Sequence, residues 1–115
     1  MKLRDFIRLH NNDEVEVYDK YLDTIPYYVS SDYAFNDTED EKNFRLMEDW
    51  IQSLEVENVR GTTCNVDVYS QVEKRFEDTR DDEYIIGYTE DVFTTLSQGF
   101  YGFAELFCED FNLKG

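Results

Sequence analysis

Two short stretches of the chain alternate between apolar and polar residues, as half-buried β-strands do. They span residues 14–19 and 63–70, and their apolar sides are Val15 and Val17 in the first and Cys64, Val66 and Val68 in the second. VEVYD in the first stretch resembles VDVYS in the second. Two explanations of this likeness are open: an ancient β-β-α duplication, or a chance likeness of two strands that face one core. Residues 24–31 and 83–88, rich in β-branched and aromatic side chains, predict two more strands. The first of them belongs at a sheet edge or begins at Pro26, since proline cannot donate to a neighbouring strand.

Apolar residues at steps of three and four predict two main helices, near 39–54 and 90–112. Thr38 and Glu41 have the spacing of a capping box at the start of the first helix. Its inward stripe consists of Phe44, Met47, Ile51 and Leu54. Gly99 and Gly102 weaken the second helix, which predicts a kink or two shorter helices there.

Two shorter helical segments complete the pattern. Leu3, Phe6 and Ile7 predict an N-terminal helix that Asn11 and Asn12 close, and residues 69–76 predict a helical turn. These elements predict an α+β fold with a small, mostly antiparallel sheet, covered on one side by the two main helices. The 115 residues, 41% apolar and 17% aromatic, suffice for the core of a single domain over 1–115.

The charge of the chain is strongly negative. It has 27 Asp and Glu against 11 Lys and Arg, a formal charge of −16. Such a surface repels nucleic acid and anionic membranes, and it attracts basic protein surfaces at high association rates. We therefore expect neither direct nucleic-acid binding nor a membrane partner.

Residues with catalytic or ligating chemistry are few. The thiols of Cys64 and Cys108 fall on predicted core positions, and His10 is the single histidine, so nothing in the sequence joins a nucleophile to a base. The acidic runs lack the glycine of a calcium-binding loop, and there is no Cys/His cluster for zinc or glycine-rich loop for phosphate. We expect a non-enzymatic protein without cofactor or metal. Two distant cysteines and no signal-peptide pattern predict free thiols in the cytoplasm.

Acidic runs beside tyrosines are the candidate binding surface. Carboxylates pair with arginine, and tyrosine rings accept its guanidinium group by stacking. In the first predicted helix, Glu41, Glu48 and Glu55 repeat every seven residues, about 10 Å along the axis and near three base-pair steps of DNA. The predicted partner-binding residues are Asp37, Glu39, Asp40, Glu41, Glu48, Glu55, Glu77, Asp78, Asp81, Asp82, Glu83, Tyr84 and Tyr88.

In size, charge and composition, and through its runs NDTEDE, EDW and EDTRDDE, the chain resembles small acidic inhibitors carried by phages and other mobile elements. These are the anti-CRISPR and anti-restriction proteins that mimic nucleic acid. The resemblance implies a stoichiometric inhibitor whose partner is a nucleic-acid-handling enzyme, such as a CRISPR effector or a restriction enzyme. An acidic immunity protein or antitoxin that neutralises a basic nuclease, and an accessory protein whose acidity only gives solubility, remain alternatives. A homodimer contact through the phenylalanine-rich C-terminal segment also stays open.

Overall fold

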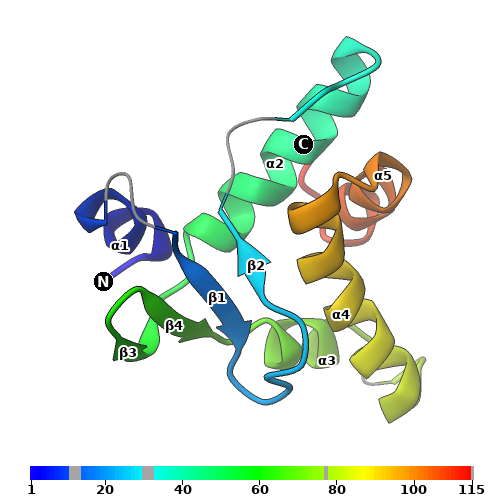
Figure 1. Cartoon of the computed structure of the whole chain (residues 1–115). Coiled ribbons are helices and arrows are strands. Elements are labelled where there is room, and N and C mark those ends of the chain that lie inside the picture. The colour runs from blue at the N-terminus through cyan, green and yellow to red at the C-terminus, as the bar shows by residue number, and fades with distance from the viewer. Residues whose placement is uncertain (11–13, 30–32, 77, 115) are drawn as a thin grey trace.

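The computed structural model describes residues 1–10, 14–29, 33–76 and 78–114 (Figure 1). The described part of the chain contains five α-helices and four β-strands, so the predicted α+β class is confirmed. The helices are α1 (Leu3–Leu9), α2 (Thr38–Gln52), α3 (Tyr69–Phe76), α4 (Asp82–Gln98) and α5 (Tyr101–Asp110). The strands are β1 (Glu16–Asp19), β2 (Tyr27–Tyr28), β3 (Glu57–Arg60) and β4 (Thr63–Val66). The predicted closure of α1 by Asn11 and Asn12 lies outside the described residues.

The four strands form one mixed sheet in the order β2-β1-β4-β3. The outer pairs, β1 with β2 and β3 with β4, are antiparallel, whereas the central strands β1 and β4 run parallel. The expectation of a mostly antiparallel sheet therefore holds for the outer pairs and is wrong at the centre. The long connection through α2 explains this, because it returns the chain for a parallel pairing as a short hairpin cannot. β2, which follows Pro26, lies at an edge as predicted.

One face of the sheet is buried and the other is partly open. Val17, Tyr27, Cys64 and Val66 belong to the core together with Phe44, Met47 and Ile51 of α2. On the opposite face, Tyr18, Thr63 and Asn65 line a shallow hollow instead of packing beneath a helix. α4 lies beside β2, at the edge of the sheet (Figure 1). The expected cover of one side by both main helices is therefore confirmed in part, because α2 shares the core with the buried face whereas α4 lies at the sheet edge.

The N-cap of the helix α2 is Asp37 and not Thr38, which the predicted capping box required. The Asp37 side chain accepts a 2.7 Å hydrogen bond from the Asp40 backbone N–H, so Asp37 is the N-cap and Thr38 the first helical residue. Both residue types can cap, and an ionised aspartate gives the stronger acceptor. The predicted inward stripe is confirmed for Phe44, Met47 and Ile51, which are fully buried.

The predicted strand 83–88 is wrong, because these residues belong to α4. Asp81 is the N-cap and accepts a 2.9 Å hydrogen bond from the Tyr84 backbone N–H. Ile85, Tyr88 and Val92 are buried at helical spacing, which continues the stripe of Phe93 and Leu96 toward the N-terminus. The tertiary contacts of this stripe override the β-propensity of the short segment.

The helical segment predicted near 90–112 consists of two helices, most of α4 and all of α5. Gly99 ends α4 in the left-handed region, with φ 75°, and its N–H donates to the Thr95 carbonyl. A residue with a Cβ avoids that conformation, so glycine is the usual residue at such an end. Gly102, by contrast, lies inside α5. The break predicted from the two glycines is confirmed, and it falls at Gly99.

The similar stretches at 15–19 and 66–70 occupy different places in the fold. The first is mostly β1, whereas the second spans the end of β4 and the start of α3. In the parallel pairing, Val17 lies opposite Cys64 and Asp19 opposite Val66, which is a different alignment from that of the sequences. Because the stretch expected to be a strand after the second copy is helical, the structure favours a chance likeness over a duplication.

The Asp19 carboxylate joins the end of β1 to the start of α3. Asp19 is 2% exposed, and its Oδ1 atom accepts hydrogen bonds from the backbone N–H groups of Val68 and Tyr69, at 2.9 and 2.8 Å. Its Oδ2 atom accepts from Tyr21 and Leu22, at 2.8 and 3.1 Å. A buried carboxylate with four such donors is well satisfied, so Asp19 has a structural role.

Candidate functional site

The first acidic surface surrounds the start of α4. Asp78, Asp81, Asp82 and Glu83, which we name the α4 acidic cluster, are all exposed. Asp81 caps the helix, and Asp82 and Glu83 lie in its first turn, where the helix dipole stabilises negative charge. This local stabilisation helps to explain how the chain accommodates so many like charges in six residues. Glu77 lies outside the described residues.

Within the described part of the chain, no cation forms an ion pair with a carboxylate of the α4 acidic cluster. Arg80, the cation closest in sequence, donates to the Thr79 carbonyl at 3.0 Å. Its guanidinium carbon lies 4.9 Å from the centroid of the Tyr84 ring. The cluster therefore keeps its negative charge available at the surface.

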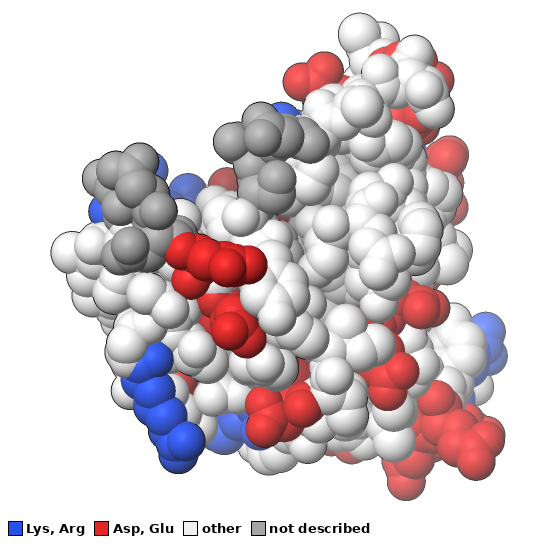
Figure 2. All heavy atoms as spheres, in the orientation of Figure 1, with Lys and Arg blue, Asp and Glu red and all other residues white. Residues whose placement is uncertain are grey.

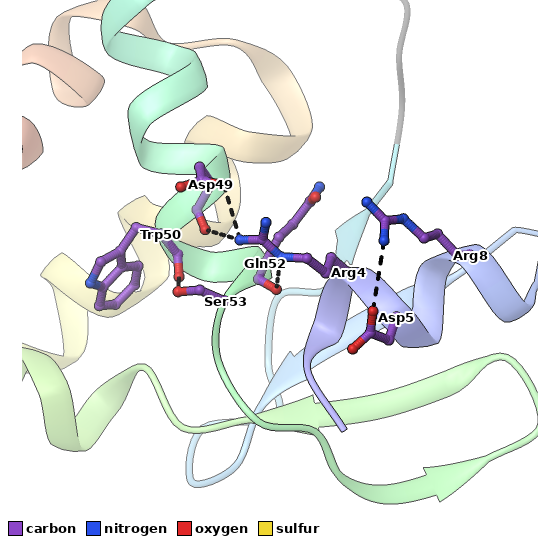
Figure 3. A network of polar contacts seen from close by, with 7 residues as sticks. All are labelled: Arg4, Asp5, Arg8, Asp49, Trp50, Gln52 and Ser53. Carbon is purple, nitrogen blue, oxygen red and sulfur yellow. Dashed lines mark hydrogen bonds and ion pairs between the residues drawn. The ribbon is translucent and has the colours of Figure 1, made fainter.

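Other basic residues are engaged elsewhere in the fold. Arg4 of α1 donates to the Asp49 carboxylate at 3.0 Å and to the Gln52 carbonyl at 3.4 Å, at the C-terminal end of α2 (Figure 3). A cation at that end complements the helix dipole. Lys20 forms an ion pair with Glu57 at 3.3 Å. These pairings engage Arg4 and Lys20 with carboxylates outside the α4 acidic cluster.

Tyr84 and Tyr88 differ in role, although the sequence predicts both as binding residues. Tyr84 is 38% exposed and lies beside the α4 acidic cluster, whereas Tyr88 is 4% exposed. The Tyr88 ring packs 5.0 Å from Phe76 and 5.0 Å from Phe103, between centroids. Burial, followed by the hydrogen bond to Asp110, raises the pKa of the Tyr88 phenol. Tyr88 thus belongs to the core, and Tyr84 is the ring that the surface presents.

A second acidic surface, the α2 acidic cluster, comprises Asp37, Glu39, Asp40 and Glu41 at the start of α2. Here Asp37 is the N-cap, and Glu39 forms an ion pair with Lys114 at 3.5 Å. Partial burial, with the charges of Asp37 and Glu105 next, raises the pKa of Asp40. The α2 acidic cluster is therefore partly neutralised by a cation of the same chain.

The structure separates the two clusters. Figure 2 shows Asp and Glu side chains gathered at the upper tip, where α2 starts, and at the lower right corner, where α4 starts. Most of the surface between these two corners carries neither acidic nor basic side chains in this view. The predicted site residues therefore form two separate surfaces and not one continuous face.

The predicted row of Glu41, Glu48 and Glu55 is wrong as a helical stripe. α2 ends at Gln52, so Glu55 lies beyond the helix, where it pairs with the N-terminal ammonium group at 2.8 Å. Glu48 pairs with Arg45 at 3.0 Å and is half-buried. The spacing of DNA phosphates is therefore not reproduced on this helix.

The thiols and the imidazole lie on different elements. Cys64 of β4 and Cys108 of α5 are buried and free, as predicted, and burial raises the pKa of the Cys64 thiol to about 12. A thiol with so high a pKa is a poor nucleophile. The His10 ring packs on Phe6, 4.6 Å between centroids. Among the described residues, no group of three or more His, Cys, Asp or Glu side chains could hold a metal ion.

Sequence reasoning missed a groove between α4 and α5 that lies next to the α4 acidic cluster. Its lining includes Glu83, Tyr84 and Tyr88 of the predicted set, and also Gly87, Asp91, Phe103 and Leu106. The spacing of Glu83, Gly87 and Asp91, four residues apart, is the signal that could have found one wall. This signal was overlooked because residues 83–88 were predicted as a strand, in which a four-residue spacing does not indicate a helix face.

No family model matches the chain, and no curated protein or solved structure matches it either. Within the described residues, no helix is both long and apolar enough to cross a lipid bilayer.

Proposed function

We propose that the protein is a stoichiometric inhibitor that binds the basic, nucleic-acid-binding surface of a host defence nuclease, of the anti-CRISPR or anti-restriction type. The observation that carries this proposal is the α4 acidic cluster, exposed and without an ion pair to any cation in the described part of the chain. Unpaired surface carboxylates raise the repulsion within a chain of charge −16. A cation-lined partner would relieve that repulsion on binding.

The exposed ring of Tyr84 supports a protein partner. Carboxylates attract any cation, but a tyrosine ring beside them adds stacking for arginine and apolar contact area. The Arg80 guanidinium over Tyr84 displays the same interaction within the chain. The α4 acidic cluster is therefore the preferred binding surface, ahead of the α2 acidic cluster, in which Lys114 already pairs with Glu39.

Affinity capture from a host lysate, at low and at high salt, tests the proposal. A triple variant with Asp78→Asn, Asp82→Asn and Glu83→Gln removes three of the four carboxylate charges of the cluster. Asp81 is left intact because it caps α4. The matched control, Glu14→Gln with Asp23→Asn and Glu73→Gln, removes three exposed carboxylates elsewhere.

We expect a basic nuclease to be captured at low salt by the wild type and the control, to be lost at high salt, and to be lost from the triple variant. Electrostatic association weakens as salt screens the charges. The captured enzyme should also lose its nucleic-acid binding at a stoichiometric amount of inhibitor. Capture that is equal for the two triple variants would refute the α4 acidic cluster as the binding surface. A toxin as the captured nuclease would favour the immunity-protein alternative.

A further inference from the structure

The groove between α4 and α5 has an acidic wall and an apolar wall. It encloses about 330 Å³ and is lined by Glu83, Tyr84, Gly87, Tyr88, Asp91, Phe103 and Leu106. Glu83, Gly87 and Asp91 follow one another at four-residue steps along α4, so they share one face of the helix. Eight residues of helix place the Cα atoms of Glu83 and Asp91 about 12 Å apart along the axis. Gly87 lies between them and leaves the wall open.

The opposite wall and the floor are apolar. Phe103 of α5 packs edge to face on Tyr88, and Leu106 is 43% exposed. Because the Tyr88 hydroxyl already donates to Asp110, a ligand at the floor of the groove would contact the Tyr88 ring and not its hydroxyl. Exposed apolar surface beside carboxylates suits a ligand that is apolar along its length and cationic at its end.

The carboxylates of the groove have no partner among the residues that the structure describes. Neither Glu83 nor Asp91 forms a hydrogen bond or an ion pair through its side chain with another residue of the described ranges. Partial burial raises the pKa of Asp91, which means that the fold disfavours its charged form. A cation bound in the groove would reverse this effect.

We propose that this groove receives an arginine side chain of the basic partner, with the guanidinium group between Glu83 and Asp91 and the aliphatic stem along Phe103 and Leu106. The inference rests on the proposed function and identifies the side chain by which the partner would bind. An apolar segment would leave the two carboxylates buried without partners, and an anion would be repelled.

Arginine fits the groove better than lysine. A guanidinium group is planar, stacks on aromatic rings and makes paired hydrogen bonds to a carboxylate, whereas an ammonium group is a strongly hydrated point charge. The chain itself places guanidinium groups on rings, Arg80 at 4.9 Å from Tyr84 and Arg45 at 5.2 Å from Phe35. Rings of this protein therefore accept arginine at stacking distance.

Gly87 makes the groove testable without disturbing the core. A Cβ atom at Gly87 would meet no atom within 4 Å, so the variant Gly87→Leu fills the groove from its wall. Leucine is also a better helix former than glycine, so the fold is retained. Gly102 of α5 is the matched control, because a Cβ there also meets no atom within 4 Å and Gly102 does not line the groove.

Titration of the ¹⁵N-labelled protein with nona-arginine and, separately, with nona-lysine tests the inference at low salt. We expect nona-arginine to shift the amide signals of 83–91 and 103–106 and to bind roughly fivefold more tightly than nona-lysine. Gly87→Leu and Asp91→Asn should each weaken nona-arginine binding several-fold, and Gly102→Leu should not. Equal affinity for the two peptides, or unchanged nona-arginine binding by Gly87→Leu, would overturn the inference.

The two proposals can fail separately. Gly87 and Asp91 are outside the triple variant that tests the α4 acidic cluster. Loss of partner capture on neutralising that cluster, together with no effect of Gly87→Leu on nona-arginine, would refute the groove and leave the proposed function standing. No binding of either peptide at low salt would refute both.

Discussion

The Tyr88 hydroxyl donates a 2.9 Å hydrogen bond to the Oδ2 atom of Asp110 and so joins α4 to the last residue of α5. The Tyr88 ring, in turn, packs against Phe76 of α3 and Phe103 of α5. One side chain therefore orients three helices, and two of them form the groove. The proposed binding surface is held by the core beneath it and not by its own exposed residues.

Replacement Tyr88→Phe removes this hydrogen bond and keeps the ring. We expect the free energy of unfolding to fall by about 1 kcal/mol, because Asp110 loses a donor. Urea denaturation measures the loss. Tyr84→Phe is the control, since the Tyr84 hydroxyl makes no hydrogen bond with the described residues. An equal loss in both variants would show that the bond to Asp110 adds nothing.

Replacement Asp19→Asn changes few atoms and should still be severe. Each carboxylate oxygen of Asp19 accepts hydrogen bonds from two backbone N–H groups. In the variant, the asparagine NH₂ group would replace one of these oxygens and face two donors without accepting from either. We expect a loss of about 2–3 kcal/mol in the free energy of unfolding, measured from the denaturant midpoint. Asp23→Asn is the control, because Asp23 is exposed and asparagine tolerates its positive φ of 50°. Midpoints that agree between the two variants would contradict this role of Asp19.

Replacement Gly99→Ala should weaken the junction of α4 and α5. Its φ of 75° disfavours alanine, and a Cβ would lie 3.2 Å from the Tyr101 hydroxyl oxygen. We expect a loss of about 1–2 kcal/mol, measured by thermal or urea unfolding. Gly102→Ala, inside α5, should instead gain roughly 0.5–1 kcal/mol. The opposite order of stability would refute the junction as described.

The sequence predicted elements well where the apolar spacing was long and regular. The stripe of Phe44, Met47 and Ile51 indicated α2, and the alternation around Val17 and Cys64 indicated the two central strands. These patterns are local and reflect burial directly. The parallel pairing of β1 with β4 was not predictable in this way, because it depends on how the connection through α2 returns the chain.

The start of α4 shows why the candidate site was predicted only in part. Residues 83–88 are rich in β-branched and aromatic side chains, yet their helical state depends on contacts with Phe103 and Phe107, which are distant in the sequence. The strand prediction still identified the exposed carboxylates and Tyr84 as candidates. It did not place Glu83, Gly87 and Asp91 on one face, because they align only in a helix. The prediction that Glu55 continues the helical row was wrong for a related reason, because contacts with α1 determine where α2 ends.

Replacement Asp91→Asn should stabilise the fold at neutral pH. Burial raises the pKa of Asp91 in the folded state, so ionisation of this carboxyl destabilises the fold at pH values above its ordinary pKa. The gain in melting temperature should therefore be full near pH 7 and vanish below about pH 3, where the carboxyl is protonated in both states. Glu55→Gln should behave oppositely, because the N-terminal ammonium group lowers the pKa of Glu55, so its stabilising effect is present at neutral pH and lost as pH falls. Melting temperatures of the wild type and both variants, recorded across this pH range, provide the measurement. A change from the wild type of the same sign and size in both variants would rule out the effect of burial at Asp91.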